Sequence, residues 1–287
     1  MKQGYLTIAA KRPRFLEMAV DMCLSLREHT KLPIAIATDE ALAGLARRRY
    51  ASVFDEITMI PPRFLTGRAL KYGAAEASPF EETVFVDADC ILLGSTDDAF
   101  AALERADMAM IGEQLTADDN LHHHGFSTSY LIRRFGLERY LKTNSGFFCF
   151  RRSAALEIME ECRECYLNEV LPALRWTRFL GRWLGDELAF GIVGGRRGLA
   201  TLPKPDHMFW PHELRRLDLA NPEKSLLHMI WPLATHTLDT LMSQTAARRA
   251  AAGVPGNAEA HWRDEVRKLQ WMVFRQRLLW PLTRRSP

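Results

Sequence analysis

Hydrophobic and polar positions follow two periods along the first hundred residues. Short apolar runs of strand length lie at residues 4–10, 33–38, 54–60 and 83–89. Stretches with apolar residues three and four positions apart, as on one face of a helix, lie at residues 14–29, 41–50 and 69–77. Strands that alternate with helices predict an α/β fold with a central, mostly parallel sheet flanked by helices.

The pattern loosens in the second half of the chain. A strand-like run at 107–112 precedes a polar segment at 115–130 that is too long for a routine connection, so we expect a functional loop there. A strand at 147–150, a helix from Ser153 and a short helix at 185–193 then restore the alternation.

The C-terminal segment has a different composition. Basic residues separate apolar positions at helical spacing, namely Trp262, Val266, Leu269 and Val273. The spacing predicts a basic amphipathic helical tail at 251–287, which either docks on the protein or lies on an anionic membrane surface. Residues 1–250 are expected to form one domain with halves at 1–100 and 101–250.

Overall composition excludes several classes of protein. The 287 residues are 47% hydrophobic with a formal net charge of +3, which is too small to indicate a nucleic-acid partner. Basic residues at 11, 12 and 14 interrupt the first apolar run, so we expect neither a signal peptide nor a membrane span. The five cysteines include Cys162 and Cys165, which we interpret as plain helix cysteines, and the odd number favours a reducing cytoplasm.

Candidate chemistry appears at the end of the fourth strand, in VFVDADCILLG. Asp87 and Asp89 follow an apolar run, at the edge where parallel sheets bind ligands. Alternate residues of an extended chain point the same way, so both carboxylates can reach one hard cation, which would in turn bind a phosphate. A purely turn-capping role is the alternative, disfavoured because no adjacent Arg or Lys balances the two charges.

The segment LKYGAAEASPFEETVFVDADCILL resembles the DxD region of GT-A glycosyltransferases, in particular glycosyltransferase family 8, the glycogenin-like and bacterial lipopolysaccharide group. The resemblance implies a Rossmann-like GT-A fold whose first half binds the nucleotide and whose second half binds the sugar and acceptor. Asp87 and Asp89 match the aspartates that hold Mn²⁺ or Mg²⁺ on the diphosphate of a nucleotide-sugar donor. Lys71 matches a Lys upstream of that strand.

Two further stretches are similar to parts of the same family. The opening strand and helix imply that Thr7, Ala9 and Asp39 lie where the uracil and ribose bind. LLHMIWP resembles the late His motif, and this resemblance implies that His228 is the candidate third metal ligand. The family's following Gly and Lys-Pro-Trp are absent here, so the diphosphate contact falls to Arg196 or Arg197 as candidates.

The sugar-binding motifs are similar as well. TNSGFFCFRRS corresponds to the family's N-A-G strand and keeps Asn144 and Gly146, while GDELAF matches an Asp-Gln pair with Asp186 and Glu187. The resemblance implies that Asn144, Asp186 and Glu187 orient the donor sugar and the attacking hydroxyl. The carboxylate of Glu187, where the family has an amide, raises the alternative that it acts as a nucleophile.

Two other histidine-containing stretches stand out. Three adjacent side chains cannot all face one ion on a regular element, so His122–His124 are expected in a solvated or acceptor-facing loop rather than a metal site. The aromatic stretch His207–Pro211 either stacks on a ligand or is buried core.

The expected function is retaining transfer of a hexose, from a UDP-sugar, to a saccharide, lipid-linked sugar or protein acceptor. The expected location is the cytoplasm or, through the tail, the inner face of a membrane. One alternative is a nucleotide-sugar binding protein without turnover. A phosphohydrolase of the haloacid-dehalogenase type is a disfavoured alternative. In that class the DxD lies on the first strand and a Thr or Val follows two residues after the second Asp, whereas here the DxD comes later and Ile91 takes that position.

Overall fold

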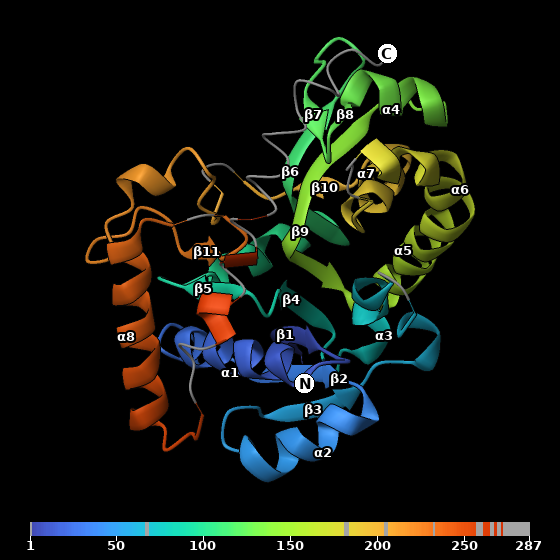
Figure 1. Ribbon diagram of the computed structural model, residues 1–287. Helices are drawn as coiled ribbons and strands as arrows, with labels where there is room; N and C mark the ends of the chain where they lie inside the picture. Colours follow the sequence, from blue (N-terminus) through green and yellow to red (C-terminus); the bar gives the residue numbers. More distant parts are fainter. Residues whose placement is uncertain are drawn as a thin grey trace. The chain divides into compact units, whose positions relative to one another are not determined.

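The computed structural model describes residues 2–66, 69–180, 184–203, 206–231, 233–256, 261–264, 267–268 and 271. The chain forms two compact units, each assembled from segments that are distant in sequence (Figure 1). Unit 1 comprises Met1–Gln3, Ile60–Phe85 and Ala99–Lys204, and unit 2 comprises Gly4–Met59, Val86–Asp98 and Pro205–Pro287. The domain limits expected at residues 100 and 250 remain predictions.

Unit 2 contains three parallel strands in the order β1-β2-β3, which are β1 (Gln3–Ala9), β2 (Ile34–Thr38) and β3 (Glu56–Met59). Its helices are α1 (Pro13–Arg27), α2 (Glu40–Arg49) and α8 (Thr235–Ala251). All of β2 and nearly all of β1 are buried, as expected for parallel strands covered on both faces. A separate antiparallel pair joins β5 (Cys90–Leu92) to β11 (Leu226–His228).

A buried ion cluster fastens α8 to α1 within unit 2, where the two helices are in contact and cross at a steep angle (Figure 1). Arg249 is 2% exposed and donates hydrogen bonds to Asp21 Oδ1 at 2.5 Å and Glu17 Oε2 at 2.8 Å. The indole of Trp262 is fully buried and donates to Asp21 Oδ2 at 2.9 Å. This first member of the expected apolar stripe therefore packs on protein, whereas Val266, Leu269 and Val273 lie outside the described residues.

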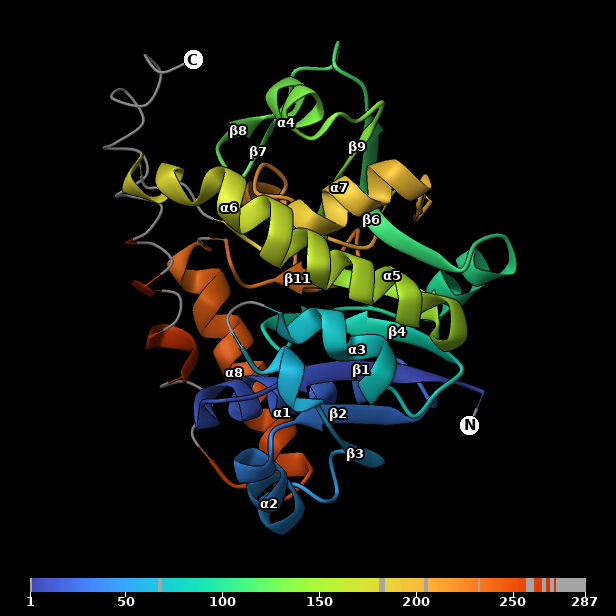
Figure 2. The same ribbon diagram turned by 90° about the vertical axis from the view of Figure 1, so that its right-hand side faces the viewer.

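Unit 1 contains four strands in the order β10-β6-β9-β4, which are β10 (Ala200–Thr201), β6 (Met108–Leu115), β9 (Tyr140–Arg151) and β4 (Glu82–Val86). A small hairpin joins β7 (His122–His123) to β8 (Phe126–Ser127). The helices are α3 (Ala74–Ala77), α4 (Thr128–Phe135), α5 (Arg152–Cys165), α6 (Leu171–Leu174) and α7 (Glu187–Arg197). In Figure 2, α5 and α7 lie beside each other, and both pack against β9.

The ladder between β6 and β9 is interrupted by a bulge. Met110 pairs with Phe148, but the next residue, Ile111, pairs with Asn144, so residues 145–147 of β9 bulge out of the ladder. Such irregularities re-aim side chains and are frequent next to active sites. The bulge carries Ser145 and Gly146, two residues of the predicted sugar-binding motif.

The expected fold class is confirmed, since the mostly parallel sheet is flanked by helices, with β9 as an antiparallel member. Several expected boundaries were wrong. The helix expected at 69–77 is a 3₁₀ turn at Leu70–Gly73 followed by α3, and the polar segment 115–130 holds the β7–β8 hairpin and the start of α4. Polar residues therefore form regular structure where only a loop was expected.

The cysteines and part of the stretch His207–Pro211 lie in the buried interior. All five cysteines are buried thiols outside any disulfide, and burial raises the pKa of Cys165 to about 12. Met208 and Phe209 are buried, which supports the core interpretation of His207–Pro211. Among the residues that the structure describes, none of the helices is long and apolar enough to cross a membrane.

Candidate active site

In unit 2, the two aspartates of the DxD stretch and His228 come together. His228 Nε2 lies 3.1 Å from Asp89 Oδ1 and 3.8 Å from Asp87 Oδ2. The pairing of β11 with β5 sets His228 opposite Cys90, and the Met229 amide donates to the Asp89 carbonyl at 2.9 Å. The backbone therefore fixes the imidazole beside Asp89.

The carboxylates of Asp87 and Asp89 converge through a turn, and not along a continuing strand as expected. β4 ends at Val86, and the two aspartates lie in a tight turn closed by a hydrogen bond from the Cys90 amide to the Asp87 carbonyl at 3.1 Å. The expectation that the strand continues through Asp89 was wrong. Turn geometry, rather than strand alternation, brings the carboxylates to one imidazole nitrogen.

This donor set fits a divalent cation. Two carboxylates in range of one imidazole carry like charges that a cation would offset, and oxygen donors suit Mg²⁺ and Mn²⁺. His228 is 4% exposed, while the side chains of Asp87 and Asp89 are 16% and 29% exposed. The arrangement therefore combines a buried nitrogen with accessible oxygens. The buried thiol of Cys90 lies close to Asp89 and His228, with ligand atoms within 4.8 Å of one another.

The residues expected near the nucleotide base lie at the ends of β1 and β2. Thr7 and Ala9 are buried in β1. Asp39 caps α2, where its Oδ1 accepts from the Leu42 amide at 2.9 Å, and its Oδ2 accepts from the Lys11 amide. These contacts give Asp39 a structural role, and the role of all three residues in binding a nucleotide remains a prediction.

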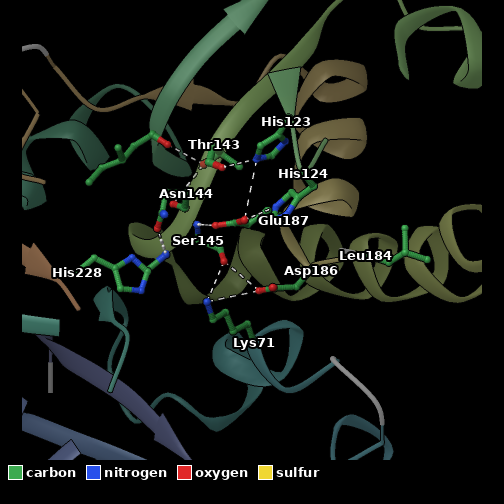
Figure 3. A network of polar contacts seen from close by, with 12 residues as sticks. Lys71, His123, His124, Thr143, Asn144, Ser145, Leu184, Asp186, Glu187 and His228 are labelled. Atoms are coloured by element: carbon green, nitrogen blue, oxygen red, sulfur yellow. Dashed lines mark hydrogen bonds and ion pairs between the residues drawn. The ribbon is translucent and has the colours of Figure 1, made fainter. Parts of the chain in front are cut away.

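In unit 1, Lys71 lies beside Ser145 and Asp186 (Figure 3). Lys71 Nζ donates to Ser145 Oγ at 2.8 Å and lies 3.5 Å from Asp186 Oδ2, to which the Ser145 hydroxyl donates at 3.0 Å. The Tyr72 hydroxyl donates to the Asp186 carbonyl at 2.8 Å. The structure thus brings together three residues that the sequence places far apart.

Glycines let α7, whose N-terminus carries Asp186 and Glu187, approach β9 closely. A Cβ at Gly191 would lie 2.4 Å from the Tyr140 ring, and one at Gly195 would lie 2.0 Å from the Arg139 carbonyl oxygen. Only a residue without a side chain fits at these contacts. The glycines of GIVGG therefore allow α7 to pack closely against β9, which places the carboxylates of Asp186 and Glu187 near the β9 bulge.

Glu187 has partners on both carboxylate oxygens. Its Oε1 accepts from the Ser145 amide at 3.1 Å, and its Oε2 contacts His124 Nε2 and lies 4.0 Å from His123 Nε2. Burial alone would raise the pKa of Glu187, but the charge and close contact of His124 outweigh burial and lower it. Asn144 lies in the same bulge, where its Oδ1 accepts from the Gly146 amide at 2.8 Å.

Of the expected solvated or acceptor-facing histidine loop, the solvated alternative was wrong for two of the three members, and the acceptor-facing alternative stays a prediction. His123 and His124 lie at the tip of the β7–β8 hairpin and point toward Glu187 (Figure 3), while His122 is exposed. His124 and Gly125 have φ of 51° and 82°, and positive φ at both loop residues is what a type I′ hairpin turn requires. The His-Gly pair was the sequence signal for this hairpin, weaker than the usual Asn-Gly.

Arg196 and Arg197 have other partners than the expected diphosphate. Arg196 forms two hydrogen bonds with the Glu169 carboxylate, at 2.8 and 2.6 Å. Arg197 pairs with Glu157 at 2.6 Å and also contacts Glu161. Both arginines thus fasten the C-terminal turn of α7 to α5 and the turn that follows it, which leaves them without support as phosphate ligands.

No family model matches the chain, and no curated protein matches its sequence. Among solved structures, the apo form of the glycosyltransferase GlyE of Streptococcus pneumoniae is similar, with a TM-score of 0.55, 11% identity, and coverage of 93% of this chain and 64% of GlyE. This chain therefore spans less than two thirds of GlyE.

Two further solved structures are similar. The galactosyltransferase LgtC, in complex with donor and acceptor sugar analogues, has a TM-score of 0.52 at 11% identity, with 91% of this chain and 99% of LgtC covered. The bifunctional glycosyltransferase WbbM in its apo form has a TM-score of 0.51 at 12% identity, with 92% and 51% covered. The fold is the GT-A glycosyltransferase fold. The resemblance stated from the DxD segment is thereby confirmed at the level of the fold.

Proposed function

We propose that the chain is a metal-dependent glycosyltransferase that moves a hexose from a UDP-sugar to a hydroxyl group of its acceptor, with retention of configuration. The observation that carries the proposal is the convergence of Asp87, Asp89 and His228 directly after β4. The GT-A fold supports the proposal, although fold by itself does not establish activity.

Asp87, Asp89 and His228 would hold a divalent cation, Mn²⁺ or Mg²⁺. A cation bound there supplies charge neutralisation for a diphosphate leaving group. Asp87 and Asp89 keep accessible oxygens, and the buried His228 fixes their direction through its contact with Asp89. Thr7, Ala9 and Asp39 would border the nucleoside, and Lys71 would support Asp186 rather than reach the diphosphate.

Asn144, Asp186 and Glu187 would orient the donor sugar and the attacking hydroxyl, which is catalysis by positioning. Both oxygens of Glu187 already accept or contact donors, and its pKa is lowered. A carboxylate of this kind is a weak nucleophile. Its contacts favour a role in charge stabilisation over attack on the anomeric carbon.

The acceptor class follows only from resemblance, so we propose a saccharide, a lipid-linked sugar or a protein side chain. The proposed location is the cytoplasm, with peripheral contact at the inner face of a membrane through the basic tail. Removing residues after 260 should then lower binding to vesicles that contain phosphatidylserine. Unchanged vesicle binding would leave the tail as a docked element, the role that Trp262 favours.

A second function, binding of a nucleotide sugar without turnover, is favoured by one observation. Arg196 and Arg197, the candidate substitutes for the missing Lys-Pro-Trp lysine, are both occupied by glutamates. The phosphohydrolase alternative has no such support, because Asp87 and Asp89 follow β4 rather than the first strand.

The deciding experiment measures UDP release from a panel of UDP-sugars with Mn²⁺, with and without simple saccharide acceptors. We expect at least one donor to be consumed by the wild type and none by Asp89→Asn. Binding of UDP-sugars with neither hydrolysis nor transfer over the whole panel would favour the binding protein. Release of phosphate from an aryl phosphate would favour the phosphohydrolase.

A further inference from the structure

Glu187 shares its buried position with the imidazole of His124. His124 Nε2 contacts Glu187 Oε2, and the two side chains are 15% and 16% exposed. His124 Nε2 is buried and makes this ionic contact without an aligned hydrogen bond, and Nδ1 makes no hydrogen bond to the described residues. The type I′ turn fixes the backbone at His124, so the direction of this side chain is set by the hairpin.

The neighbouring histidine is already committed to the protein. The Tyr140 hydroxyl lies 2.6 Å from His123 Nδ1, and the Thr143 carbonyl lies 3.0 Å from His123 Nε2. A carbonyl can only accept, so His123 Nε2 carries a hydrogen, whereas the Tyr140 hydroxyl can either donate to Nδ1 or accept from it. Burial first, and then the charge of His124, lower the pKa of His123 to about 3. His123 is therefore a neutral support, and it is not available as a metal ligand.

Each carboxylate of this cluster has a basic side chain beside it. Lys71 Nζ lies 3.5 Å from Asp186 Oδ2, and His124 Nε2 contacts Glu187 Oε2. A carboxylate can only accept hydrogen bonds, whereas a carboxylate with an imidazolium offers both an acceptor and a donor without net charge. Such a pair matches the hydroxyl groups of a neutral sugar.

We propose that His124 and Glu187 act as one neutral pair that recognises the hexose of the donor, with His124 Nδ1–H donating to a sugar hydroxyl. The inference rests on the proposed function, because it assumes a sugar donor. It adds a sugar-contacting residue from the β7–β8 hairpin. It also predicts that recognition of the hexose requires His124 only when residue 187 is a glutamate.

The test is a double-mutant cycle with His124→Asn and Glu187→Gln. Asn tolerates the positive φ of the turn, so the hairpin is kept while the imidazole is lost. Gln supplies a donor and an acceptor in one neutral group, which makes the imidazole dispensable. His122→Asn, at an exposed position of the same hairpin, is the matched control.

The readout is binding by calorimetry of UDP, UDP-glucose and UDP-galactose in the presence of Mn²⁺, together with thermal unfolding of each variant. With Glu187 intact, His124→Asn should lower affinity for the preferred UDP-hexose about tenfold while UDP affinity changes less than about twofold. When Glu187→Gln is already present, adding His124→Asn should change neither affinity by more than about twofold. The control should bind all three ligands like the wild type.

Two results would overturn the inference and they are distinguishable. In the first, His124→Asn lowers the affinities for UDP and UDP-hexose equally, or lowers UDP-hexose affinity by the same factor with Glu187 as with Glu187→Gln. The imidazole is then only structural, and the proposed function still stands. If the wild type binds none of the three ligands, the proposed function fails and the sugar-binding pair fails with it.

Discussion

His228 Nε2 lies 3.1 Å from Asp89 Oδ1 although 139 positions separate the two residues in the sequence. The antiparallel pairing of β11 with β5 makes this contact, because it sets His228 opposite Cys90. A contact built by backbone pairing is in place before any ligand binds. The residues of the proposed metal site are therefore already brought together without the substrate.

His228→Ala should weaken Mn²⁺ binding by more than about tenfold, since loss of a partner outside the ligand shell alone often costs 10–100-fold. Cys90→Ser is the control, because a hard cation prefers oxygen ligands and should not need the thiol. Mn²⁺ affinity can be measured from the electron paramagnetic resonance signal of the free ion. Equal affinities for the wild type and His228→Ala would exclude His228 as a ligand.

Gly195→Ala should destabilise the protein by about 1–3 kcal/mol, because the added Cβ would lie 2.0 Å from the Arg139 carbonyl and α7 must move away from β9. Turnover of donor should fall as well, since α7 carries Glu187. Gly44→Ala in α2 is the control, because its Cβ would meet only the flexible end of Arg48 at 3.3 Å. That substitution should leave stability unchanged or raise it by up to about 1 kcal/mol. Urea unfolding monitored by tryptophan fluorescence measures both effects.

Trp262→Ala should destabilise the protein by about 3–5 kcal/mol, because it removes a fully buried indole and its hydrogen bond to Asp21. Trp271, in the same C-terminal segment, is 64% exposed, so Trp271→Ala should change stability by less than about 0.5 kcal/mol. Chemical denaturation of both variants measures the difference. Similar values for the two variants would show that Trp262 does not fasten the tail in solution.

The pH dependence of stability should depend on Glu187. Its pKa is lower in the folded protein than the ordinary value of 4.5, so the carboxylate stabilises the fold above that value. This contribution is lost as the pH falls below about 4.5 towards the folded pKa. The difference in unfolding free energy between the wild type and Glu187→Gln should therefore be larger, in favour of the wild type, at pH 7 than at pH 3. A difference between the two proteins that is independent of pH would contradict the lowered pKa.

The sequence predicted the α/β class because strands and helices of the first hundred residues have clear and different periods. It also identified Asp87, Asp89 and His228 as partners, although only resemblance linked His228 to the pair. Strand periodicity alone gave a wrong account of their geometry, because it extended β4 through Asp89. A turn closed by the Cys90 amide leaves no mark on the hydrophobic pattern.

The contacts of Glu187 were not predictable from periodicity. They require a two-residue turn with positive φ at His124 and a bulge at residues 145–147. Each is a local backbone feature inside a segment whose composition indicates only a polar loop or a strand. The glutamate partners of Arg196 and Arg197 were not predictable for a similar reason, since they lie up to 40 residues earlier in the chain.

The most direct test of the proposed metal and diphosphate site is calorimetric titration of UDP into the wild type and Asp89→Asn, each with and without Mn²⁺. We expect UDP to bind the wild type only when Mn²⁺ is present, and we expect Asp89→Asn to lose this binding. Binding of UDP that is equally strong without the metal, or unchanged in Asp89→Asn, would contradict a metal-bridged diphosphate at Asp87, Asp89 and His228.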